Sequence, residues 1–65
     1  MDPRFPDVAV QLSGEDGNAF AVLGKVAREL RRAGHGDQVD AYMAKATAGD
    51  YQQLLATTMR WVEVH

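Results

Sequence analysis

The chain has no cysteine and no isoleucine, and Ser13 is its only serine among 65 residues. The lack of cysteine excludes disulfides and thiolate metal sites, and it fits a reducing compartment. A serine nucleophile needs a base within reach, yet the only histidines are His35, between two glycines, and His65, the last residue. We therefore predict that the protein is not an enzyme and has no catalytic residues.

Long apolar runs are also missing, since none approaches the roughly 18 residues that span a bilayer. The first residues, MDPRFPD, are acidic and interrupted by prolines, unlike a secretory signal. The net charge of −2 and pI near 5.5 argue against binding nucleic acid by bulk electrostatics. We expect a soluble cytoplasmic protein with no membrane partner, and the charge disfavours a nucleic-acid partner.

The hydrophobic content of 46 % is typical of a globular protein, but ten of these residues are alanine. A chain of this length forms one domain and buries only about 60 % of the surface that its unfolded form exposes. A core with so few bulky side chains predicts either close helix packing or burial against a second copy.

Two short strands are predicted at the ends of the chain. Residues 1–7 contain Pro3 and Pro6 and are predicted to be a flexible lead-in to a single domain over residues 8–65. Val8 to Leu12 alternates between apolar and small or polar side chains, which predicts a half-buried strand. Residues 61–64 alternate again and are rich in strand-forming residues.

The clearest element is an amphipathic helix within Asp16–Gly34. Asp16 or Asn18 is suited to cap its first turn, and Gly34 is suited to a left-handed cap at its end. Gly24 inside a helix costs about 1 kcal/mol relative to alanine, which predicts a close packing contact there. The predicted apolar stripe comprises Ala19, Val22, Leu23, Val26, Leu30 and Ala33, widened by Phe20 and Ala27.

Two further helices are predicted, one capped by Asp37 and ended by Gly49, the next capped by Asp50. Since these two helices almost touch in the sequence, the chain must turn sharply at residues 48–50. The predicted inward residues are Val39, Tyr42, Met43 and Ala46 in the first, and Tyr51, Leu54, Leu55, Thr58 and Met59 in the second.

The order of elements predicts an α+β fold, a small single β-α-α-α-β domain in which two short terminal strands pack with three helices. The strands should pair because a lone strand leaves its backbone groups unsatisfied, and the sequence leaves their relative direction open. A two-stranded sheet is marginal alone and has two open edges. A homodimer formed through these strand edges is therefore one hypothesis.

No metal or cofactor site is predicted. Asp16 and Asn18 share the spacing that begins a calcium loop, but Phe20 occupies the position of the third ligand. Gly14 and Gly17 precede a helix as in a phosphate-binding turn, but the lysine of that motif is absent, and the two acidic residues between the glycines repel phosphate.

The candidate interaction surface is the basic side of the central helix, Lys25, Arg28, Arg31 and Arg32, together with Trp61. The basic residues either form a solvated face that complements the helix dipole, or dock an acidic partner protein or a phosphate-rich surface. Trp61 is either a core residue or an interface anchor.

The alternative function is that of a small DNA-binding regulator, in which the two helices within residues 37–60 pack like a helix-turn-helix. The second helix of this pair, Tyr51–Arg60, offers Gln52, Gln53 and Thr57 to base edges. It has only one basic residue, and Asp50 would face the phosphates.

The segments DGNAFAVLG, GDYQQLL and MRWVEV resemble a family of small proteins from bacteriophages, notably those of actinobacteria, and from bacterial chromosomes. The resemblance covers Val10 to Val64, whereas the proline-rich lead-in departs from the family pattern. It implies a phage or prophage origin and the cytoplasm of a bacterial host. The family has no assigned activity, so no functional residue is transferred. The predicted function is a non-enzymatic interaction module that binds a host or phage protein, or its own copy.

Overall fold

The computed structural model describes residues 3–12 and 18–65, and it confirms the predicted order of strands and helices. Strand β1 (Phe5–Val10) precedes helix α1 (Ala19–Arg32). One turn of 3₁₀ helix, η1 (Gly36–Gln38), leads into α2 (Val39–Ala46). Helix α3 (Tyr51–Trp61) continues directly into β2 (Val62–Val64). The molecule is an α+β domain.

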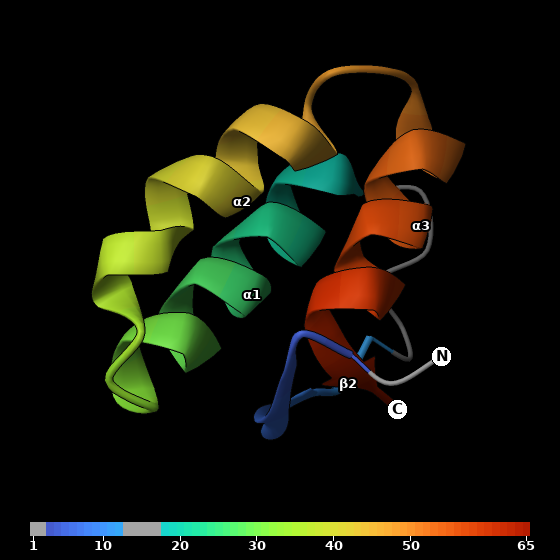
Figure 1. Cartoon of the computed structure of the whole chain (residues 1–65). Helices are drawn as coiled ribbons and strands as arrows, with labels where there is room; N and C mark the ends of the chain where they lie inside the picture. Colours follow the sequence, from blue (N-terminus) through green and yellow to red (C-terminus); the bar gives the residue numbers. More distant parts are fainter. Residues whose placement is uncertain (1–2, 13–17) are drawn as a thin grey trace.

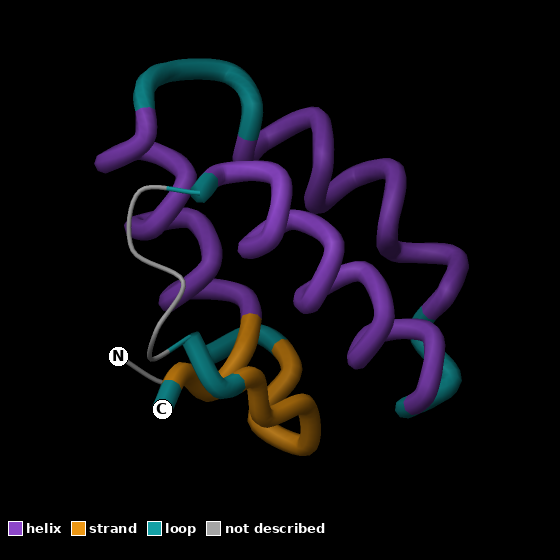
Figure 2. The backbone as a smooth tube through the Cα atoms, turned by 180° about the vertical axis from the view of Figure 1, so that it is seen from behind, coloured by secondary structure: helices purple, strands orange, loops and turns teal. Residues whose placement is uncertain are grey.

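The three helices lie side by side, and successive helices run in opposite directions (Figure 1). Both strands lie at one end of the helices (Figure 2). They pair in parallel, with Phe5 opposite Val62, Ala9 opposite Glu63, and Val10 opposite Val64. The sheet therefore joins the two ends of the described chain.

Strand β1 begins at Phe5, three residues before the predicted start at Val8. The Arg4 amide donates to the Arg60 carbonyl at 2.8 Å, and the Phe5 ring packs 5.6 Å from the Trp61 ring. The pairing is irregular between Phe5 and Ala9, where Pro6 has no amide hydrogen to donate. The lead-in predicted over residues 1–7 thus includes the first three residues of the strand.

Both ends of α1 form as their residues predict. The Asn18 side chain accepts a hydrogen bond from the Ala21 amide at 3.1 Å. Gly34 has a φ of 87°, and the next amide, that of His35, reaches back to the Leu30 carbonyl at 2.7 Å. This left-handed glycine with its backward hydrogen bond is a Schellman cap. Asp16, the other predicted cap, lies outside the described residues.

The buried stripe of α1 is narrower than predicted. Val22, Leu23, Val26, Ala27 and Leu30 are buried as expected, and Ala19 is partly buried. Phe20 is 85 % exposed and Ala33 is also exposed, so both predictions were wrong. Phe20 lies about 90° around the helix from the centre of the stripe, and Ala33 is the C-cap residue, beyond the last turn.

Gly24 lies on the exposed side of α1, and a Cβ atom there would meet nothing within 4 Å. The predicted close contact at this residue is therefore wrong.

Helix α2 begins and ends differently from the prediction. Asp37 lies inside η1 rather than at a cap, and no side chain caps the start of α2 at Val39. The helix ends at Ala46, before Gly49, and the Thr47 hydroxyl then donates to the Met43 carbonyl at 2.7 Å. The predicted inward side is confirmed: Val39, Tyr42 and Ala46 are buried and Met43 is partly buried.

Helix α3 is capped by Asp50, which accepts from the Gln53 amide at 2.9 Å as predicted. Leu54 and Thr58 are buried, and Tyr51 and Leu55 are partly buried. Met59, predicted to face inward, is 63 % exposed. Thr57 is buried in its place, with 5 % of its surface exposed. The buried side of α3 includes Thr57 and Trp61 but not Met59.

A hydroxyl chain crosses the core between α2 and α3. The Tyr42 side chain is fully buried, and its hydroxyl lies 2.7 Å from the Thr58 hydroxyl. Thr58 donates in turn to the Leu54 carbonyl at 2.9 Å, so Tyr42 donates to Thr58. Burial raises the pKa of Tyr42. The edge of the Tyr42 ring contacts Trp61, with 5.7 Å between the ring centroids.

We predict that Gly24→Ala stabilises the protein by about 1 kcal/mol, because alanine forms helix better and the site is open. Thermal unfolding followed by circular dichroism should show a higher midpoint. Gly34→Ala is the control and should destabilise, since its φ of 87° strains any other residue. An unchanged or lower midpoint for Gly24→Ala would contradict the exposed position of this residue.

A second prediction concerns the hydroxyl chain. Thr58→Val leaves the buried Tyr42 hydroxyl without its acceptor and should cost about 1–3 kcal/mol. Tyr42→Phe leaves the Thr58 hydroxyl bonded to the Leu54 carbonyl and should cost only about 0.5–1.5 kcal/mol. Urea unfolding measures both variants. A larger cost for Tyr42→Phe than for Thr58→Val would reverse the donor assignment.

Candidate functional site

The basic face of α1, defined as Lys25, Arg28, Arg31 and Arg32, points away from the core. The three arginines are exposed and Lys25 is partly buried. Arg32 pairs with Glu29 on the preceding turn, with 3.4 Å between Nη1 and Oε2. Arg28 and Arg31 have no acidic partner within residues 3–12 and 18–65. Two guanidinium groups are thus available for a partner's carboxylate or phosphate oxygens.

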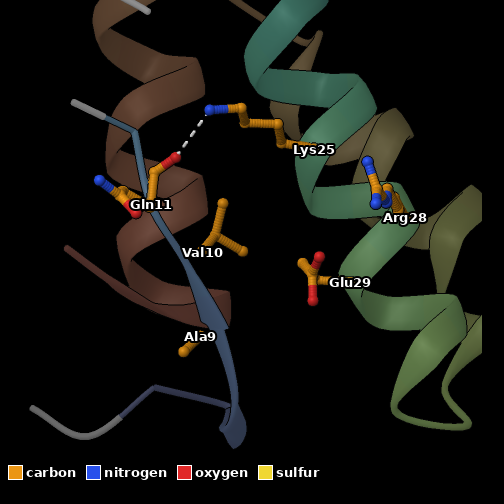
Figure 3. A pocket seen from close by; sticks show the side chains of 6 residues that line it. All are labelled: Ala9, Val10, Gln11, Lys25, Arg28 and Glu29. Carbon is orange, nitrogen blue, oxygen red and sulfur yellow. Dashed lines mark hydrogen bonds between the residues drawn. The ribbon is translucent and has the colours of Figure 1, made fainter. Parts of the chain in front are cut away.

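A groove of about 280 Å³ separates this helix from β1 (Figure 3). Ala9, Val10 and Gln11 line the strand side of the groove, and Lys25, Arg28 and Glu29 line the helix side. The Lys25 ammonium crosses the groove and donates to the Gln11 carbonyl at 3.0 Å. Gln11 was not a predicted site residue, since no local pattern shows which helix lies beside the end of a strand.

A second hollow of about 240 Å³ lies beside the exposed Phe20, where the start of α1 meets the turn between α2 and α3. Its lining is mostly apolar and includes Leu23, Ala46 and Leu54. An exposed aromatic next to an apolar hollow is a common feature of protein interfaces. Phe20 was predicted to be part of the apolar stripe, so its place on the surface was not predicted from the sequence.

Trp61, the remaining predicted site residue, is 4 % exposed. Its ring lies between the aromatic side chains of Tyr42 and Phe5, and the Arg4 guanidinium lies over it, 4.7 Å from its centroid. Of the two roles considered, Trp61 has the core role, and it does not belong to the basic face.

The α2–α3 pair presents few groups to a DNA duplex. Thr57 is buried and accepts from the Gln53 side chain at 3.4 Å. Gln52, Gln53 and Arg60 are the exposed residues of α3 that remain for bases or phosphates. Arg60 is the single basic residue in this set, so a duplex would gain little electrostatic attraction from the helix.

His35 joins two distant parts of the chain. Its Nε2 lies 3.0 Å from the Asp7 carboxylate, and its ring packs against Phe5 with 4.5 Å between centroids. The hydrogen bond from His35 is the main reason why the pKa of Asp7 is lowered. The two residues are far apart in sequence, so no spacing rule connects them.

The described residues contain no group of three His, Asp, Glu or Cys side chains able to hold a metal ion. None of the helices in residues 3–12 and 18–65 has the length and apolar character to cross a bilayer. Comparison of the chain with protein-family models, with curated proteins and with solved structures gives no match.

The Asp7–His35 contact predicts an acid-dependent loss of stability. Because folding lowers the pKa of Asp7, its contribution is present above the unfolded pKa, near 3.8, and is lost as pH falls through the lower folded pKa. The urea midpoint of the wild type should therefore fall more steeply than that of Asp7→Asn below about pH 4. Parallel pH profiles for the two proteins would show that the contact does not stabilise the fold.

Proposed function

We propose that the chain is a non-enzymatic interaction module that binds an acidic partner protein through the basic face of α1. The observation that carries this proposal is the charge of that face in a chain whose net charge is −2. Arg28 and Arg31 are exposed, and the described chain offers them no carboxylate. No buried charge lies among residues 3–12 and 18–65 for these arginines to neutralise, so both guanidinium groups are left for an external partner.

The same side of α1 also offers an apolar contact. Phe20, Gly24 and Arg28 follow one another at steps of four residues and so lie in one row along the helix. An aromatic anchor beside arginines is the combination that dominates many protein interfaces. The charges would steer the partner and fix its orientation, and the aromatic ring would supply the apolar area that charged rims lack.

The setting of this function is the bacterial cytoplasm, as implied by the resemblance to small phage proteins. The partner would then be a host or phage protein with an acidic surface. The sequence segments DGNAFAVLG, GDYQQLL and MRWVEV support this part of the proposal.

The test is affinity capture from an actinobacterial lysate with quantitative mass spectrometry. The wild type should retain one or a few acidic proteins, and Arg28→Glu with Arg31→Glu should lower their recovery by about tenfold or more. Lys45→Glu with Arg60→Glu is the matched control, since it makes the same charge change at exposed residues of α2 and α3. Equal recovery with both double variants, or no retained protein, would overturn the proposal.

The DNA-binding alternative is tested by retention of the wild type on double-stranded DNA. We expect no retention of the wild type on double-stranded DNA at about 50 mM salt, because α3 has too few basic residues for phosphate contacts. Retention that falls steeply with salt, and that Arg60→Glu abolishes, would replace the interaction module with a DNA-binding regulator.

The other possible partner is a second copy of the chain, bound through the strand edges. A second copy could extend the two-stranded sheet to four strands and cover one open edge on each molecule. Analytical ultracentrifugation separates this case from a foreign partner. A monomer at high micromolar concentration would exclude the homodimer.

A further inference from the structure

The direction of the backbone groups of β1 shows which of its residues face away from β2. The Val10 carbonyl accepts from the His65 amide at 2.9 Å, and the Leu12 amide donates to the His65 carbonyl at 3.0 Å. Successive residues of an extended strand direct their amide and carbonyl groups to opposite sides. Ala9 and Gln11 therefore direct theirs to the outer edge of β1.

This outer edge forms one wall of the groove beside α1 in Figure 3. The Lys25 ammonium donates to the Gln11 carbonyl across the groove, so the outward groups of this edge face the groove. Ala9 is exposed and small, and Val10 is buried and forms the apolar floor. An approaching main chain would thus meet no bulky side chain at Ala9.

We propose that this groove binds an extended acidic segment of the partner, which adds to the outer edge of β1 as a third strand. The inference rests on the proposed function and assigns the partner's conformation and contact site. Main-chain hydrogen bonds to Ala9 supply affinity, and the alternate side chains of the segment supply specificity.

The charges along the helix wall determine the chemistry of that segment. Lys25 and Arg28 are cationic, and Glu29, the one carboxylate among the described residues of the lining, is paired with Arg32 at 3.4 Å. A strand in the groove places every second side chain on the α1 side. Acidic residues at these alternate positions meet Arg28, whereas lysine or arginine there would be repelled.

An extended segment fits this edge better than a helix does. The main-chain groups of a helix bond to one another, so a helix has no donors or acceptors for Ala9 apart from those at its ends. A second copy of this chain also fits poorly. Two-fold pairing of two β1 edges would bring the basic α1 walls of both molecules, with Lys25 and Arg28, toward each other.

The experiment selects ligands from a yeast-displayed library of random decapeptides and maps the selected peptides on the ¹⁵N-labelled full chain by NMR. The peptides should be enriched in alternating acidic and β-branched residues. Their binding should shift the Ala9 and Gln11 amide signals and slow hydrogen exchange at the Ala9 amide by about tenfold or more.

Two single variants on the same helix provide the matched comparison. Arg28→Glu lies in the groove and should weaken peptide binding by about tenfold, whereas Arg31→Glu lies outside the groove lining and should change it less than about threefold. Ala9→Pro removes the outward amide without removing a bond to β2, and it should also weaken binding. If Ala9→Pro fails to fold, the arginine pair and the exchange measurement decide the question.

Three outcomes would overturn the strand addition. Peptides that bind without affecting Ala9 or Gln11, with equal losses in Arg28→Glu and Arg31→Glu, would leave the basic face as a docking surface but place the ligand elsewhere. The absence of selected peptides would exclude linear segments, while lysate capture would still test the proposed function. Concentration-dependent shifts at Ala9 without peptide would identify a second copy as the occupant.

Discussion

The parallel pairing of β1 with β2 is the constraint on which the rest of the structure depends. The strands come from opposite ends of the described chain, so their pairing holds the three helices in one closed arrangement. The pairing also determines which edge of β1 remains outside. Because Val10 is bonded to β2, Ala9 faces outward beside α1. The pairing of β1 with β2 therefore both closes the fold and determines which edge of β1 is left as the candidate binding edge.

Aromatic and hydroxyl side chains reinforce this closure in a chain with few large aliphatic residues. Phe5 at the start of β1 packs on Trp61, the last residue of α3, and Trp61 contacts Tyr42 of α2. The Tyr42 hydroxyl then bonds Thr58, which fixes α2 against α3. A core built mainly of valine and leucine side chains gains specificity from these directed contacts, since apolar side chains alone would pack in several ways.

Local sequence signals predicted the elements well because their physical causes are local. Asn18 and Asp50 cap helices through amides three residues away, and Gly34 adopts the left-handed conformation that ends α1. The apolar periodicity located the centre of each buried stripe. The order of elements, and with it the fold class, followed from these signals.

The wrong predictions concern residues whose burial depends on helices or strands that are distant in the sequence. Periodicity gives the apolar side of a helix but not how far its neighbours cover that side. Phe20 and Met59 lie at the edge of the apolar side of their helices, where no neighbouring element buries them. Thr57 lies at an edge that neighbouring elements do bury. The early start of β1 depends on the packing of Phe5 against Trp61, which no local pattern reveals. The basic residues of α1 were predicted from their spacing, but the groove beside them required the position of β1.

The central claim is that a partner binds where the basic face of α1 adjoins the outer edge of β1. A photo-cross-linking amino acid placed at Ala9 tests it directly in the lysate, with the same substitution at exposed Ala44 of α2 as a reference. We predict that Ala9 cross-links to an acidic segment of a protein that the wild type captures, and that Ala44 does not. Cross-links from Ala44 alone, or equally from both residues, would contradict the account.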